Sequence, residues 1–148
     1  MLGAAAAIVA SGVVLATSAL AATPVASGDY ENVNQNRLDF LVVSRDGTSG
    51  AFTVDPNRCN DGLSIPGDRK ATISPTGVVT YNGYGRGTDE VRGRLVTYYI
   101  KLVINGSFTS PNRLKWKATI TVPGGKGLSV KHCKETVSAN LKLTRIAR

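Results

Sequence analysis

Histidine and cysteine are the scarcest chemistry-bearing residues of this chain. One His and two Cys occur among its 148 residues. A single imidazole excludes metal sites built from two or three histidines, and two thiols are too few for a four-thiolate zinc site or a disulfide-dense miniprotein. We therefore expect neither a metal nor a cofactor.

Acidic residues are also few, and they are unevenly distributed. The whole chain has a formal net charge of +8. The stretch from Ala22 to Glu90 contains 6 basic and 9 acidic residues, whereas the stretch from Val91 to Arg148 contains 12 basic and 1 acidic. A strongly basic half favours anionic polymers as partners.

Charged side chains are absent before Asp29. Residues 1–22 are small or apolar apart from two Ser and one Thr, and Ala19-Leu20-Ala21 offers the small residues that a signal peptidase requires. We predict a secretory signal peptide over residues 1–21, cleaved before Ala22, although the usual basic residue at its start is missing. An uncleaved membrane anchor is the alternative, since about 20 apolar residues can span a bilayer.

The rest of the chain has the length and composition of one folded domain. A content of 42% hydrophobic and 19% charged residues excludes a disordered chain, and 148 residues leave room for hardly more than one domain. Residues 22–36 are rich in Ser, Asn and Gly, and we predict a flexible lead-in there. The folded domain is then expected over residues 37–148.

Helical periodicity is absent from this domain, and its patterned segments alternate every second residue. In residues 114–122, Leu114 and Trp116 begin an inward face that alternates with Lys115 and Lys117 on an outward face. Further strands are predicted over 38–43, 51–54, 70–73, 78–81, 95–104, 107–109, 128–130 and 137–143. Asp46-Gly47 and Asn105-Gly106 are predicted as hairpin turns. About eight short strands are typical of a sandwich or a barrel, and we predict a single antiparallel β-sandwich, immunoglobulin-like in general architecture.

The two cysteines are expected to form one disulfide. An oxidising exterior favours pairing Cys59 with Cys133, and a closed loop of about 75 residues would stabilise the fold by about 4.5 kcal/mol. The alternative is that Cys133, beside His132, is a reactive thiol or a metal ligand. That alternative needs a second ligand cluster, which the chain lacks.

Four segments carry a resemblance to a known group of proteins: Cys59, the stretch 104–110 (INGSFTS), the stretch 118–122 (ATITV) and Cys133. In these segments the chain resembles the small secreted two-cysteine β-sandwich proteins of actinobacteria. The chain departs from their pattern at Lys115-Trp116, where a small residue and glycine are more usual. The resemblance implies a sandwich fold and brings no activity, catalytic residues or cofactor.

Patterns typical of catalysis are weak. His132 could serve as a base, but no nucleophile motif accompanies it, so we interpret it as a surface histidine. Five carboxylates that a glycosidase could use are interpreted as solvated loop acids instead. They are Asp55, Asp61, Asp68, Asp89 and Glu90. We predict that the protein is not an enzyme.

Two further motifs have a functional and a structural interpretation. Residues 83–87 (GYGRG) resemble a phosphate-binding loop but lack the helix that should follow it, so we predict a wide loop that exposes Tyr84 and Arg86. Asn105-Gly106-Ser107 matches a glycosylation sequon, which we interpret as incidental to the predicted hairpin.

The basic half yields the functional hypothesis. The expected polyanion-binding residues are Lys101, Arg113, Lys115, Lys117 and Lys142. We expect a secreted monomer that binds an anionic cell-wall polymer or polysaccharide, with no specific nucleic acid and no stable membrane span after cleavage. Alternatively, the charge only prevents association between strand edges. A structural or protein-interaction domain would instead expose an apolar patch on one sheet, and a small hydrolase would place two carboxylates across a cleft.

Overall fold

The computed structural model describes residues 25–34, 36–125, 127–128 and 130–148. The predicted signal peptide, residues 1–21, and its cleavage site lie outside the described residues. The strands are β1 (Gly28–Asn32), β2 (Phe40–Val43), β3 (Ser49–Val54), β4 (Ile65–Pro66), β5 (Ala71–Ile73), β6 (Val78–Val91), β7 (Arg94–Ser110), β8 (Arg113–Val122) and β9 (Cys133–Ile146). A single 3₁₀ turn, η1 (Cys59–Gly62), lies between β3 and β4 in this described part of the chain.

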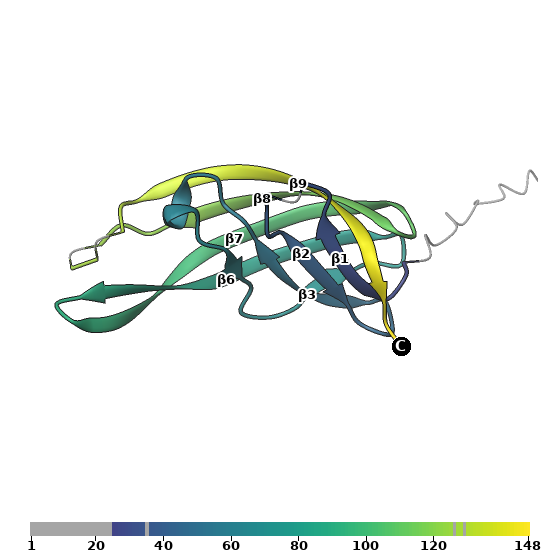
Figure 1. Cartoon of the computed structure of the whole chain (residues 1–148), viewed down its shortest axis with the longest axis horizontal. Coiled ribbons are helices and arrows are strands. Elements are labelled where there is room, and N and C mark those ends of the chain that lie inside the picture. The colour runs from purple at the N-terminus through teal and green to yellow at the C-terminus, as the bar shows by residue number, and fades with distance from the viewer. Residues whose placement is uncertain (1–24, 35, 126, 129) are drawn as a thin grey trace, which may run out of the picture.

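Eight of the described strands form a closed antiparallel barrel, not the predicted β-sandwich (Figure 1). The sheet runs in the order β2-β1-β9-β8-β7-β6-β5-β3-β4, and β2 also pairs with β3, which closes it. The short strand β4 is an extra member that pairs with β3 at Thr53 and Val54. The sandwich prediction, including the one implied by the resemblance, is wrong because the inward and outward alternation of strands is the same in both architectures.

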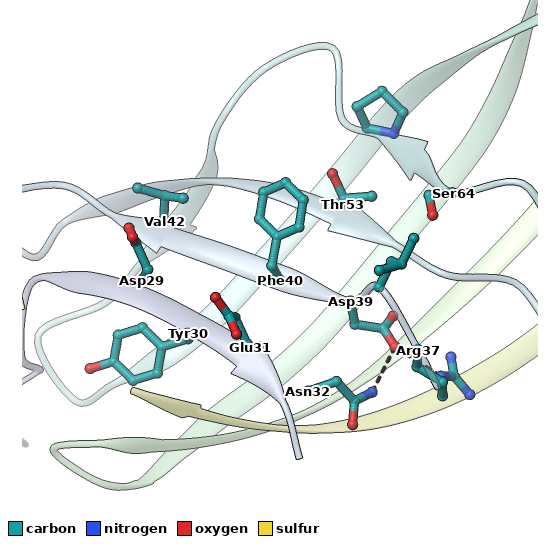
Figure 2. A pocket seen from close by; sticks show the side chains of 12 residues that line it. Asp29, Tyr30, Glu31, Asn32, Arg37, Asp39, Phe40, Val42, Thr53 and Ser64 are labelled. Atoms are coloured by element: carbon teal, nitrogen blue, oxygen red, sulfur yellow. Dashed lines mark hydrogen bonds and ion pairs between the residues drawn. The ribbon is translucent and has the colours of Figure 1, made fainter. Parts of the chain in front are cut away.

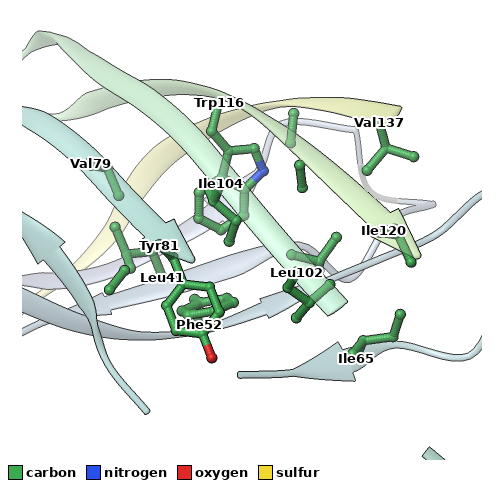
Figure 3. Close-up of a cluster of buried hydrophobic side chains, with 14 of the residues drawn as sticks. Leu41, Phe52, Ile65, Val79, Tyr81, Leu102, Ile104, Trp116, Ile120 and Val137 are labelled. Atoms are coloured by element: carbon green, nitrogen blue, oxygen red, sulfur yellow. The ribbon is translucent and has the colours of Figure 1, made fainter. Parts of the chain in front are cut away.

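The barrel interior is filled with apolar side chains (Figure 3). Alternate residues of β7 and β8 point inward, including Leu102, Ile104 and Ile120, and each of these three is fully buried. The Trp116 indole is also buried, as the alternation predicts, and its ring centroid lies 6.3 Å from that of Phe52. An eight-stranded barrel is just wide enough for its own side chains, which is what the core shows.

Strand β1 lies inside the segment predicted to be a flexible lead-in. It pairs with β2 on one side and with β9 on the other, so it completes the barrel. Tyr30 points inward and is fully buried, while Asp29 and Glu31 lie on the outer side. The lead-in prediction is therefore wrong for these five residues, because one inward tyrosine among polar neighbours is too short a pattern to detect.

Strand β6 pairs with β7 over its whole length, from Val78 opposite Ser107 to Val91 opposite Arg94. The predicted wide loop at residues 83–87 is instead the middle of β6. The predicted hairpin at Asn105-Gly106 is also wrong, because β7 continues to Ser110. A Cβ atom on Gly106 would lie 2.7 Å from the Cβ of Trp116, so this glycine serves close strand packing rather than a turn.

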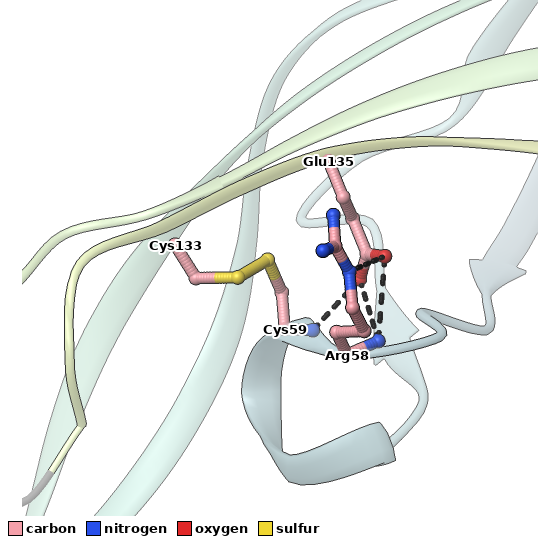
Figure 4. Close-up of a disulfide and its surroundings, with 4 residues drawn as sticks. All are labelled: Arg58, Cys59, Cys133 and Glu135. Atoms are coloured by element: carbon pink, nitrogen blue, oxygen red, sulfur yellow. Dashed lines mark hydrogen bonds and ion pairs between the residues drawn. A yellow bond between two sulfur atoms is a disulfide. The ribbon is translucent and has the colours of Figure 1, made fainter.

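The predicted disulfide is confirmed between Cys59 and Cys133 (Figure 4). It attaches η1 to the first residue of β9. The Glu135 carboxylate, also on β9, accepts hydrogen bonds from the backbone N–H groups of Arg58 (3.0 Å) and Cys59 (2.7 Å). A disulfide of this kind is typical of an oxidising compartment. No helix among the described residues is long and apolar enough to cross a membrane.

Candidate functional site

The five predicted polyanion-binding residues lie on the outer surface of three adjacent strands. Arg113, Lys115 and Lys117 alternate with the buried residues of β8 and are exposed, at intervals of about 6.8 Å along the strand. Lys142 on β9 lies directly opposite Arg113. Lys101 on β7 lies opposite Thr121 of β8, four residues further along that strand than Lys117. The closed sheet thus brings all five to one side of the barrel.

Lys134 belongs to the same surface and was not among the predicted residues. It lies on β9 opposite Thr121, so Thr121 is flanked by Lys101 on one side and Lys134 on the other. The position of Lys134 could have been predicted from alternation only if β9 had been recognised to begin at Cys133. We call the outward side chains of Lys101, Arg113, Lys115, Lys117, Lys134 and Lys142 the basic face.

The three strands of the basic face contribute no outward carboxylate. Glu135 is the only acidic residue after Glu90. Its side chain is buried, where it accepts the η1 backbone hydrogen bonds and lies 3.9 Å from the Arg58 Nε. The one acid of these three strands is therefore engaged elsewhere.

The positions of two of these cations lower the stability of the sheet. Arg113 and Lys142 are directly opposite each other on neighbouring strands, an arrangement of like charges that destabilises a sheet. Glu31 on β1 lies opposite Lys142 on its other side and offsets part of this repulsion. Glu31 also marks the border where the basic face gives way to the acidic outer side of β1.

A groove on the outer side of β1, β2 and β3 begins beyond that border (Figure 2). It has a volume of about 890 Å³. Leu38, Phe40 and Val42 are exposed along it, and Asp29 and Glu31 flank them. An apolar floor with carboxylates at its edge can accept an amphipathic, positively charged partner.

One end of this groove is held together by a buried carboxylate. The Asp39 Oδ2 lies 2.9 Å from the Arg37 Nε and accepts a hydrogen bond of 2.8 Å from the Asn32 amide. Its Oδ1 accepts a bond of 2.9 Å from the backbone N–H of Asp55. Every polar contact of Asp39 is internal, which identifies it as a support for the loop between β1 and β2.

The candidate catalytic acids that the structure describes lie in three separate segments of the chain: after β3, after β4 and in β6. Asp68 accepts a hydrogen bond from the hydroxyl of Tyr81, and Asp55 accepts from the backbone N–H of Leu38. Asp89 and Glu90 lie in β6 rather than in the predicted loop. The side chain of Asp61 lies outside the described part of the chain.

The described residues place no cluster of metal ligands around the candidate base. His132 is exposed on the connection that leads from β8 to β9. Within the described ranges, no three His, Cys, Asp or Glu side chains are close enough to hold a metal ion.

Comparison with known proteins finds no similarity for this chain: no protein-family model, curated protein or solved structure matches it.

Proposed function

We propose that this protein is a secreted, non-enzymatic module that binds anionic polymers of the cell envelope or the extracellular space through the basic face. The observation that carries the proposal is the set of six cations on β7, β8 and β9. The only acidic residue of these three strands, Glu135, is buried. Polyanion binding needs an array of cations but no deep pocket, so the outside of a barrel suits it.

The barrel also weakens the competing interpretation, that these lysines only guard a strand edge. Strand β8 is paired along its whole length with β9 and along most of it with β7. Arg113, Lys115 and Lys117 therefore lie on a strand that has no free edge. Protection against edge-to-edge association does not account for their placement.

Retention on immobilised heparin and on purified cell wall tests the proposal. We expect retention at low ionic strength and release as salt rises, because the binding constant falls with a power of the salt concentration set by the number of ionic contacts. Replacing two central cations, Lys115→Gln with Lys117→Gln, should lower the salt concentration needed for release.

A matched control removes the same charge from outside the basic face. Arg45→Gln with Arg148→Gln changes residues of the β2–β3 turn and the C-terminus, and should shift elution less. Absence of retention at low salt, retention that survives molar salt, or an equal shift for both pairs would each contradict the proposal.

A protein-interaction domain is the second candidate, and the exposed residues Leu38, Phe40 and Val42 favour it. They are the apolar patch on one sheet that such a domain requires. This function would survive a negative heparin experiment, since the groove and the basic face lie on different strands.

A further inference from the structure

The two strands β6 and β7 extend beyond the barrel as a ribbon. β7 pairs with β8 only from Lys101 onward, so residues 94–100 of β7 pair with β6 alone. On β6, the isolated bridge between Gly85 and Gly67 is the last backbone pairing, among the described residues, with the chain on the other side. Figure 1 shows the paired ends of β6 and β7 projecting away from the other strands.

Two tyrosines and two cations share the outer side of this ribbon where it leaves the barrel. Tyr84 lies directly opposite Lys101, and Arg86 directly opposite Tyr99. The two tyrosine ring centroids are 6.4 Å apart, and the Lys101 Nζ lies 4.8 Å from the centroid of Tyr84. We call these four residues the tyrosine platform.

Both rings are available to a binding partner. Tyr84 is 47% exposed and Tyr99 is 56% exposed, although inward-facing neighbours such as Ile100 are fully buried. Neither ring belongs to the core cluster, so packing inside the barrel does not require a tyrosine at either position. Glu90, four residues beyond Arg86 towards the tip, is an outward acid that limits the platform on that side.

The tyrosine platform continues directly into the basic face. Lys101 belongs to both, and the row across the sheet runs from Tyr84 through Lys101 and Thr121 to Lys134. A polymer lying across the strands would meet aromatic rings on β6 and β7 and cations on β7 and β9. Interleaved aromatic and basic side chains are what single-stranded nucleic acid requires, since bases stack on the rings and phosphates contact the cations.

We infer that the polyanion bound by this surface is single-stranded nucleic acid, recognised without sequence preference through stacking on Tyr84 and Tyr99. This inference rests on the proposed function and adds the chemical class of its polymer. A polyanion without aromatic rings gains nothing from the tyrosines, and a duplex hides its bases from them. The cations alone would treat all of these polymers alike.

Fluorescence anisotropy with a labelled oligothymidylate tests the inference, with inorganic polyphosphate and a DNA duplex as competitors. Tyr84→Ala with Tyr99→Ala should weaken oligothymidylate binding about tenfold or more, the loss expected for stacked bases. Polyphosphate binding should change little. Tyr84→Phe with Tyr99→Phe should retain oligothymidylate binding, because phenylalanine keeps the stacking surface.

Lys115→Gln with Lys117→Gln is the control, and should weaken binding of both polymers. Tyr99→Leu is a second test that keeps apolar volume on the strand and removes only the aromatic face. It should weaken oligothymidylate binding in the same direction as the double alanine change but by less, because Tyr84 remains.

Equal effects of the tyrosine changes on oligothymidylate and polyphosphate, or no effect on either, would overturn the inference and leave polyanion binding intact. No binding of either polymer at low salt would overturn both.

Discussion

Tyr30 combines a buried ring with a hydrogen-bonded hydroxyl. Its ring packs edge-on against Phe108 at 5.2 Å, and its hydroxyl lies 2.7 Å from the carbonyl oxygens of Ala26 and Pro111, to which it donates. Burial raises the pKa of Tyr30 to about 12. The hydroxyl thereby ties the segment before β1 to the β7–β8 turn, provided that it remains protonated.

Alkaline pH should therefore destabilise the fold through Tyr30. Its pKa in the folded state lies above the value of about 10 in an unfolded chain, so its contribution is complete below pH 10 and is lost as pH rises towards 12. Denaturant unfolding at pH 8 to 12 should show a fall in the free energy of unfolding as pH rises. In Tyr30→Phe this fall should be smaller by roughly 1–2 kcal/mol.

The fall in the free energy of unfolding that remains in Tyr30→Phe should reflect Tyr81. The pKa of Tyr81 is also raised to about 12, by burial first and by Asp68 second. Tyr99→Phe, at an exposed position, is the control and should leave the profile unchanged. An identical profile for Tyr30→Phe and the unaltered protein would contradict this account.

At the scale of elements, β6 shows why a glycine-rich segment can be a strand. Gly83, Gly85 and Gly87 alternate on the inner side, and larger inward side chains occupy the space that they leave. A Cβ atom on Gly85 would lie 2.3 Å from Ile65 and 2.8 Å from the carbonyl oxygen of Pro66. The glycines thus allow β4 and its neighbours to approach β6 closely.

Gly85→Ala should accordingly destabilise the protein by about 1–3 kcal/mol, because a clash with a backbone oxygen cannot be relieved by a side-chain rotation. Chemical denaturation would measure the change. Gly125→Ala is the matched control, since its Cβ would meet Leu128 at an ordinary 3.5 Å. A loss at Gly85 no greater than the loss at Gly125 would refute the packing role.

The same element shows the limit of local patterns. The exposed positions of Tyr84 and Arg86 agree with the sequence interpretation, although the predicted loop around them is wrong. Their pairing with Lys101 and Tyr99 depends on the register of β6 and β7. Nothing within residues 83–87 encodes that register, so the tyrosine platform could not be predicted.

At the scale of the whole molecule, the disulfide joins parts of the barrel that are distant in sequence. Cys59 and Cys133 are 74 residues apart. The η1 turn, which begins at Cys59, contacts β7 through the hydrogen bond that the Tyr98 hydroxyl donates to Asn60. Glu135 adds its bonds to the backbone of η1. Covalent and polar contacts therefore hold η1 in place together.

Removal of the disulfide by Cys59→Ser with Cys133→Ser should lower the free energy of unfolding by roughly 4.5 kcal/mol, the value expected for a loop of this length. Comparison of the unaltered protein with and without reductant provides the same measurement without substitution. Because the Glu135 bonds remain, the folded barrel should persist in dilute buffer. A loss below about 1 kcal/mol would show that the polar contacts alone are sufficient.

Local sequence patterns were sufficient to predict the all-β class, the inward and outward faces of β8, the disulfide and the separation of charge along the chain. These properties depend on residues close together in sequence, or on the count of a rare residue such as cysteine. The tertiary structure alone decided that the sheet closes into a barrel, that β1 completes it and that Glu135 is withdrawn from the basic face. Each of these depends on which distant strands pair, and strands with the same alternation can pair in either architecture.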